Sequence, residues 1–84
     1  MEKTISYTEV IKGYILRCAG LMELDENTDI FESGIVNSLF IIQLMTFLER
    51  DFKIKITMED LDISNFKSVK TIASFVTRKV SRVN

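Results

Sequence analysis

The clearest structural signal in the chain is the run SLFIIQLMTFLERDF, which occupies residues 38–52. Apolar side chains recur in this run with the spacing of one helix face, at Ile41, Leu44, Met45, Leu48 and Phe52. Such a stripe is stable only when it covers a core. The run therefore predicts an amphipathic helix that packs against other helices.

A second helical pattern precedes this run. Residues 7–18 carry an apolar stripe behind a capping pair formed by Ser6 and Glu9. Gly20 is expected to end this helix, because glycine readily adopts the left-handed conformation found at helix C-termini. Cys18 falls on the stripe and is therefore predicted to lie in the core.

Two further helices are expected after the run. Residues 58–61 have the composition of a helix start and predict a short third helix. Ser68 is expected to cap a last helix, whose apolar stripe continues to Val80. Residues 20–37 form a long first loop, and loops of such length are usually functional or held by their own side chains. The expected anchors of this loop are Leu21, Leu24, Ile30 and Phe31.

These elements predict an all-α fold. The expected architecture is a four-helix bundle with three longer helices, a short third helix and a long first loop. The chain contains no proline and no internal repeat, which favours one compact domain. We expect a single domain over residues 1–84, with its core over about residues 7–80.

Composition narrows the classes of function. The chain has 11 basic and 12 acidic residues and a net charge of −1, whereas nucleic-acid-binding proteins usually have a strongly basic face. It has no histidine and one cysteine, so the usual general base and a Cys/His metal cluster are missing. Glu59, Asp60 and Asp62 lack the repeating pattern of a calcium loop and fit a solvated helix end. The chain is therefore expected not to bind nucleic acid or a metal.

Segments that direct a protein to a membrane are not found. The N-terminus lacks the apolar run of a signal peptide, and no stretch approaches the length of a membrane span. We therefore expect a cytoplasmic protein that does not bind a membrane.

Ser38 has the most informative position in the chain. It stands at the start of the predicted second helix, where backbone N–H groups lack intrahelical partners and the helix dipole is positive. This place suits an anionic group, either a bound phosphate or one attached through the serine. The alternative is that Ser38 only caps the helix. A serine nucleophile is not supported, because the chain has no histidine to activate it.

The predicted second helix carries apolar residues beyond its core stripe. Phe40 and Phe47 flank the stripe and fit the core, although Phe40 also adjoins the outward side. Leu39 and Ile42 face outward and predict an apolar docking surface for another protein.

The region around Ser38 resembles the attachment region of acyl carrier proteins. The run FESGIVNSL at residues 31–39, followed by Leu44, Leu48-Glu49 and Phe52, is similar to the family pattern of Asp-Ser-Leu at the second helix, with glycine three positions before the aspartate. The resemblance extends over roughly residues 7–80. It implies that a phosphopantetheinyl transferase attaches 4′-phosphopantetheine from coenzyme A to Ser38, and that the thiol of this arm carries an acyl group. The protein itself would not be an enzyme.

Two departures from the family pattern affect recognition. Asn37 replaces the usual aspartate, which keeps size and hydrogen-bonding capacity but loses the charge. The second helix is also less acidic than in carriers of fatty acid synthesis, so partner binding should depend more on apolar contact than on charge. The predicted partner-facing residues are Asn37, Leu39, Phe40, Ile42, Gln43 and Thr46.

A narrower resemblance suggests the cargo. The run VNSLF at residues 36–40, followed by Gln43-Leu44, is similar to free-standing carriers of secondary metabolism. These hold substituted malonyl units, such as hydroxymalonyl, methoxymalonyl or aminomalonyl. The resemblance implies a monomer that meets acyltransferases, dehydrogenases and a polyketide or nonribosomal peptide synthase. The alternatives are a discrete peptidyl or aminoacyl carrier, and an unmodified helical protein-interaction module.

Overall fold

The computed structural model describes residues 6–83, with side chains for residues 6–80. It contains three α-helices and two 3-10 turns: α1 (Tyr7–Ala19), α2 (Ser38–Phe52), η1 (Met58–Asp60), η2 (Ile63–Asn65) and α3 (Val69–Val83). Residues 6–83 include no strand, and the all-α class is confirmed. In place of the predicted short third helix over residues 58–61, the structure has two separate 3-10 turns of three residues each, η1 and η2, so the four-helix bundle is not confirmed and stays a prediction.

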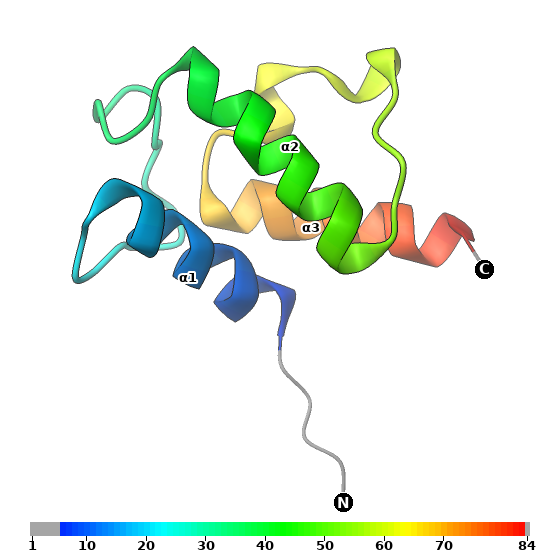
Figure 1. The fold of residues 1–84 in the computed structure, drawn as a ribbon, viewed down its shortest axis with the longest axis horizontal. Coiled ribbons are helices and arrows are strands. Elements are labelled where there is room, and N and C mark those ends of the chain that lie inside the picture. Colours follow the sequence, from blue (N-terminus) through cyan, green and yellow to red (C-terminus); the bar gives the residue numbers. More distant parts are fainter. Residues whose placement is uncertain (1–5, 84) are drawn as a thin grey trace, which may run out of the picture.

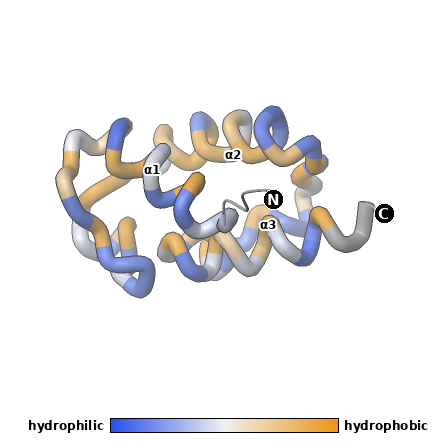
Figure 2. Tube along the Cα trace, turned by 90° about the horizontal axis from the view of Figure 1, so that it is seen from below, coloured by the Kyte–Doolittle hydropathy of each residue, from blue (hydrophilic) through white to orange (hydrophobic). Residues whose placement is uncertain are grey.

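The three α-helices enclose one core. In Figure 1, α2 runs diagonally in front of α3, and α1 lies beside them at the end that carries the first loop. The backbone of α1 has more extensive contact with α3 than with α2. Figure 2 shows α2 and α3 as two separate layers, with hydrophobic residues making up much of α2. The most deeply buried side chains are Ile11, Ile15, Ile30, Leu44, Leu48, Val69, Ile72, Phe75 and Val76.

The helix ends lie where the sequence places them. Ser6 Oγ accepts a hydrogen bond from the Glu9 N–H at 3.1 Å and caps α1. Gly20, with φ of 70°, terminates the same helix in the left-handed conformation. The Thr71 N–H donates to Ser68 Oγ at 3.2 Å, at the start of α3. All three predicted caps are thereby confirmed.

Aromatic rings join α1 to α2. Tyr14 stacks on Phe47 with a centroid distance of 4.0 Å, and its ring lies 5.9 Å from that of Phe40. Tyr7 meets Phe52 edge-on at 5.1 Å. Phe40 and Phe47 are both buried, so the core interpretation of these two residues is confirmed. The prediction that Phe40 faces a partner is wrong, because the ring of Tyr14 on α1 covers that flank.

The first loop is held by apolar side chains. Leu24 and Ile30 are buried as expected, and Phe31 is half-buried against the core. Leu21 is exposed instead of anchoring the loop; it directly follows Gly20, whose left-handed conformation ends α1 and changes the direction of the backbone.

Backbone hydrogen bonds fasten the same loop to the start of α3. The Ile30 N–H donates to the Lys67 carbonyl at 2.8 Å, and the Lys70 N–H donates to the Glu26 carbonyl at 2.9 Å. The second bond also satisfies an N–H of the first turn of α3, which has no partner within the helix.

An ion pair links η1 to α3. Lys79 Nζ lies 2.7 Å from Asp60 Oδ2, and the same oxygen accepts the Thr57 N–H at 2.9 Å. The Lys79 ammonium and the Thr57 N–H hold the pKa of the Asp60 carboxyl below its usual range. Asp62 accepts the Ser64 N–H at the start of η2. These two acidic residues therefore have structural partners at the turns.

No helix in the described part of the chain is both long enough and apolar enough to span a membrane.

Candidate functional site

The loop before α2 is folded into a series of turns. Asp29 Oδ1 accepts the N–H groups of Phe31 and Glu32, both at 2.9 Å. Gly34 follows with φ of 81°, a left-handed conformation that favours glycine. The Val36 N–H then donates to the Ile30 carbonyl at 3.1 Å. This arrangement turns the chain back onto the core and directs it into α2.

Asn37 caps α2. Its backbone is extended, with φ of −127° and ψ of −175°, and its Oδ1 accepts the Phe40 N–H at 3.1 Å. Ser38 is consequently the first residue inside the helix. The hypothesis that Ser38 only caps the helix is wrong, because its neighbour performs that role. The carboxylate of the family pattern is not needed for the cap, since an amide oxygen accepts the same bond.

The position of Ser38 is compatible with an attached anionic group. Its side chain is exposed, and α2 has no acidic residue in its first turn. The N–H groups of Ser38 and Leu39 belong to the first turn, where no preceding helical carbonyl is available to them. A phosphodiester on the Ser38 hydroxyl would lie beside these groups and the positive end of the helix dipole. The residues present therefore fit a covalently attached phosphate.

Comparison with known proteins identifies the family. The family described as phosphopantetheine attachment site matches residues 9–76 of the chain. A probable acyl carrier protein, PigG from Serratia sp. (strain ATCC 39006), is 36% identical over 55 residues. This match covers 66% of the chain, and it covers 63% of the length of that relative. The chain belongs to the phosphopantetheine-attachment family of acyl carrier proteins, whose covalent cofactor is 4′-phosphopantetheine.

The predicted partner-facing residues other than Phe40 lie at the surface. Leu39 is 63% exposed and Ile42 is 58% exposed, and the remaining three, Asn37, Gln43 and Thr46, are exposed as well. Their exposure agrees with the helical periodicity, whereas their contact with a partner stays a prediction.

The structure adds a group of apolar residues that sequence reasoning missed. Met58, Leu61 and Ile63, in and between η1 and η2, are all exposed. Met58 and Leu61 line a hollow together with Ile42 and Thr46 of α2, so the apolar surface extends from α2 onto η1. The sequence did contain a signal of this surface, because it places three large apolar residues in a segment too short to form the stripe of a helix.

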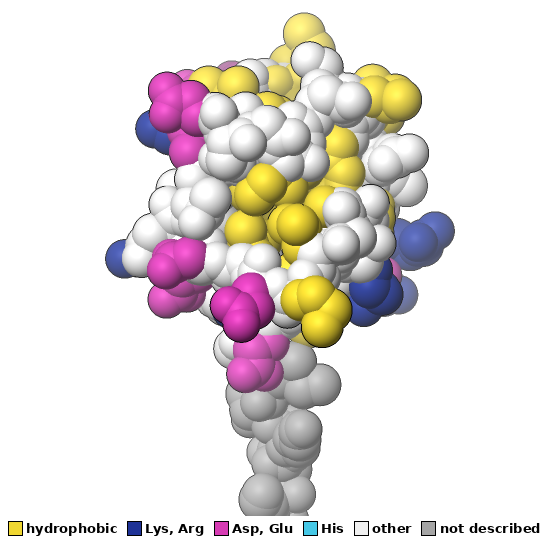
Figure 3. All heavy atoms as spheres, turned by 90° about the vertical axis from the view of Figure 1, so that its left-hand side faces the viewer, with side chains coloured by type: hydrophobic (Ala, Val, Ile, Leu, Met, Phe, Trp, Pro, Cys, Tyr) yellow, Lys and Arg dark blue, Asp and Glu magenta, His cyan; other side chains and the backbone are white. Residues whose placement is uncertain are grey.

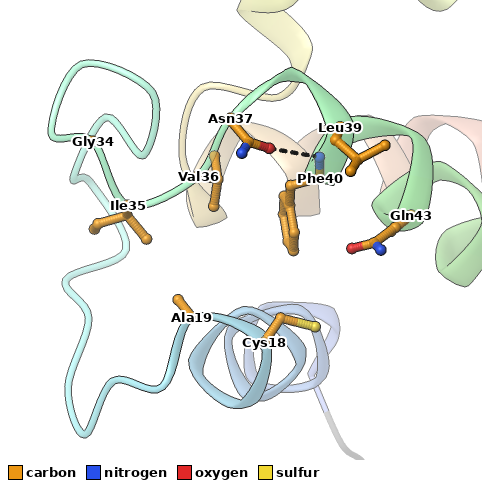
Figure 4. Close-up of a pocket in the computed structure, with 9 residues that line it drawn as sticks. All are labelled: Cys18, Ala19, Gly34, Ile35, Val36, Asn37, Leu39, Phe40 and Gln43. Carbon is orange, nitrogen blue, oxygen red and sulfur yellow. Dashed lines mark hydrogen bonds between the residues drawn. The ribbon is translucent and has the colours of Figure 1, made fainter.

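Cys18 is exposed, and the prediction that it belongs to the core is wrong. It lies on the last turn of α1, opposite the exposed Gln43 of α2 (Figure 4). The Tyr14 hydroxyl nearby donates to the Gln43 carbonyl at 3.3 Å. Burial, together with the neighbouring Cys18 thiol, raises the pKa of the Tyr14 phenol.

A groove separates the end of α1 from the start of α2. We call it the α1–α2 groove, and its volume is about 320 Å³. Figure 3 shows this end of the molecule, where apolar side chains lie between polar and charged ones. The residues that line the groove are Cys18, Ala19, Gly34, Ile35, Val36, Asn37, Leu39, Phe40 and Gln43 (Figure 4).

Proposed function

We propose that Ser38 is the residue to which a phosphopantetheinyl transferase attaches 4′-phosphopantetheine from coenzyme A. The supporting observation is the division of roles at the start of α2. Asn37 provides the cap, and the exposed Ser38 hydroxyl stands beside it in the first turn. An oxygen engaged in capping is held against the helix N–H groups, whereas the exposed Ser38 oxygen is not the capping atom and is accessible to a transferase.

We propose that the chain holds an acyl group and presents it to partner enzymes, and that it is not itself an enzyme. The arm supplies a thiol that binds an acyl group as a thioester. The chain contributes an accessible oxygen and the N–H groups and dipole of α2 beside the phosphodiester. The base that removes the Ser38 proton would come from the transferase, since this chain has no histidine. Tethering raises the effective concentration of the cargo at each partner enzyme.

We further propose that the cargo is a substituted malonyl unit of secondary metabolism. The sequence around Ser38 resembles carriers of hydroxymalonyl, methoxymalonyl and aminomalonyl units, and the relative named above is a probable acyl carrier protein. The expected partners are acyltransferases, dehydrogenases and a polyketide or nonribosomal peptide synthase. The mass of the acyl group on protein isolated from its host would test this. An aminoacyl mass would instead assign the chain to the peptidyl carriers.

The partners are proposed to dock on α2 and η1. Leu39 and Ile42 expose large apolar side chains there, and Met58 extends the surface.

We propose that residues 1–84 make up one carrier domain with its core over about residues 7–80. A single connected group of buried residues from all three α-helices supports this.

Intact-protein mass spectrometry tests the attachment site. The chain is incubated with coenzyme A and a broad-specificity phosphopantetheinyl transferase, alongside Ser38→Ala. Ser33→Ala is the matched control, because Ser33 is an exposed serine of the loop before α2. We expect one added arm on the native chain and on Ser33→Ala, and none on Ser38→Ala, which should remain folded.

Two results would contradict the proposal. One is an arm that is still added to Ser38→Ala. The other is a native chain that stays unmodified under conditions that modify an established carrier protein. The second result, with partner binding intact in Ser38→Ala, would favour an unmodified interaction module.

A further inference from the structure

The α1–α2 groove begins beside the proposed attachment site. Asn37 and Leu39, the two sequence neighbours of Ser38, both line it. Cys18 and Ala19 form its opposite wall on α1 (Figure 4). Ser38 itself is not among the lining residues, so a flexible chain that leaves it has to turn over the start of α2 to enter the groove.

The groove offers both apolar and amide surface. Val36 and Phe40 contribute apolar side chains to its lining. Asn37 uses its Oδ1 for the cap, which leaves its amide nitrogen as a donor. Gln43 directs its side-chain amide toward the groove (Figure 4), and its backbone carbonyl, not this amide, accepts the bond from Tyr14. The pantetheine arm has the matching composition, because it alternates amide bonds with methylene and methyl groups.

Among the other hollows along α2, the small one next to η2 fits this arm less well. It has about 160 Å³, half the volume of the groove, and it lies between α2 and η2. Its lining is Ile41, Leu61, Asp62, Ile63 and Phe66, with no side-chain amide among them. The Asp62 carboxylate there can accept from an amide N–H but cannot donate to an amide carbonyl, and a carbonyl left without a hydrogen-bond partner would cost about 1–3 kcal/mol.

We propose that the α1–α2 groove seats the pantetheine arm of Ser38, with the thiol end directed toward Cys18 on α1. This inference rests on the proposed attachment at Ser38. Its consequence is that the carrier holds the arm on the α1 side of α2. The apolar surface formed by Ile42 and Met58 is then left open for partners.

Backbone amide chemical shifts, compared between the unmodified and the arm-bearing protein, test the seating. Residues next to Ser38 will shift in any case, so Cys18 and Ala19 are the informative reporters. We expect both to shift in the native chain. Ala19→Leu fills the groove and should abolish the shift at Cys18, whereas Ser74→Leu, which adds the same bulk at an exposed position of α3, should not.

The outcomes separate this inference from the proposed function. If mass spectrometry shows no arm on the native chain, the attachment itself is wrong. If the arm is present and Cys18 and Ala19 do not shift, only the seating is wrong. Shifts at Leu61 and Ile63 in place of those on α1 would place the arm in the other hollow and would also overturn the inference.

Disulfide formation gives an independent readout. The arm-bearing protein is incubated with oxidised glutathione. The arm thiol and the Cys18 thiol each lose one hydrogen and form a disulfide with each other, and one oxidised glutathione is converted into two molecules of reduced glutathione. The control is Thr46→Cys in a Cys18→Ser background, because Thr46 is exposed farther along α2, outside the groove. Both rates are normalised to the reaction of each cysteine, in the unmodified protein, with a small soluble disulfide.

A seated arm should raise the local concentration of its thiol at Cys18 above that set by the tether alone. We therefore expect Cys18 to form the disulfide about tenfold faster than the cysteine at position 46. Equal normalised rates would mean that the arm samples both positions without a preferred seat. This result would overturn the inference even if Ala19→Leu failed to fold.

Discussion

Two adjacent residues, Asn37 and Ser38, have different roles at the start of α2. Asn37 stabilises the helix through its cap, and Ser38 stays accessible. Sequence reasoning predicted Ser38 as the attachment site but did not separate the two roles, because asparagine and serine are both favoured at the cap position. Only the backbone conformation shows which of the two stands before the first helical residue.

The cap of α2 leads to a prediction about the Asn37 side chain. Asn37→Ala removes the acceptor of the Phe40 N–H and should lower the free energy of unfolding by about 1 kcal/mol. Asn37→Asp keeps an acceptor and adds a negative charge near the positive helix end, so the unmodified protein should gain about 0.3–1 kcal/mol. Urea unfolding of the three proteins measures both effects.

The same variants report on the neighbouring phosphate. In the arm-bearing protein, the phosphodiester on Ser38 would repel the new carboxylate. The gain from Asn37→Asp should therefore be smaller with the arm than without it. An equal gain in the two forms would show that the phosphate lies away from the cap.

At the scale of the elements, the contact between α1 and α2 depends on aromatic rings. Tyr14 contributes both a stacked ring against Phe47 and a hydroxyl bonded to the Gln43 carbonyl. α3, by comparison, presents mainly aliphatic side chains such as Val69 and Val76 to the core, together with Phe75. The ring and the hydroxyl of Tyr14 can be separated by mutation.

Tyr14→Phe should cost about 0.5–1.5 kcal/mol of the free energy of unfolding, because it removes one hydrogen bond and keeps the ring. Tyr14→Ala also removes the stacked ring and should cost about 2–4 kcal/mol, less than a fully buried aromatic residue because Tyr14 is half-buried. Denaturant unfolding at neutral pH gives both values. Equal losses in the two variants would mean that the ring contributes nothing beyond its hydroxyl.

Element boundaries were largely predictable, because local signals set them. The stripe of residues 38–52 and the caps Ser6, Gly20 and Ser68 all lie where expected. Burial of single side chains at the margins was not predictable. Cys18 follows the stripe of α1 but lines the α1–α2 groove, and Phe40 leaves the stripe of α2 but meets Tyr14. The burial of these two side chains depends on how the helices pack against each other. The apolar periodicity of a single helix does not reveal that packing.

At the scale of the whole molecule, the ion pair of Asp60 and Lys79 connects residues far apart in the sequence. Its carboxyl pKa is lowered in the folded state by Lys79 and Thr57, so the pair stabilises the fold above the unfolded carboxyl pKa of about 3.9. That contribution is lost as the pH falls through the lower folded-state pKa.

Asp60→Asn should therefore destabilise the protein by about 1 kcal/mol at neutral pH. The difference from the native chain should shrink as the pH drops below about 3.9, where the unfolded carboxyl takes up a proton, and should be lost once the pH passes the lower pKa of the folded carboxyl. Urea unfolding across this pH range measures it, with Lys79→Met as the matched removal of the partner charge. A difference that is independent of pH would contradict the assigned cause.

The charge distribution leads to a prediction about association. The net charge is −1, and the proposed docking surface consists of uncharged side chains at Leu39, Ile42 and Thr46. Binding to a phosphopantetheinyl transferase should therefore weaken by less than about threefold between about 50 and about 200 mM salt. Titration calorimetry at several salt concentrations tests this expectation. A steep loss of affinity would show that charged residues dominate the contact.

The aromatic contact between α1 and α2 also gives the protein an optical signal of its own. The chain has no tryptophan and two tyrosines, and both tyrosines pack against rings of α2. Ultraviolet emission and near-ultraviolet circular dichroism from these rings therefore originate at a single seam between two helices. Movement of α2 against α1, during loading or partner binding, should be visible to a spectrometer without any added dye.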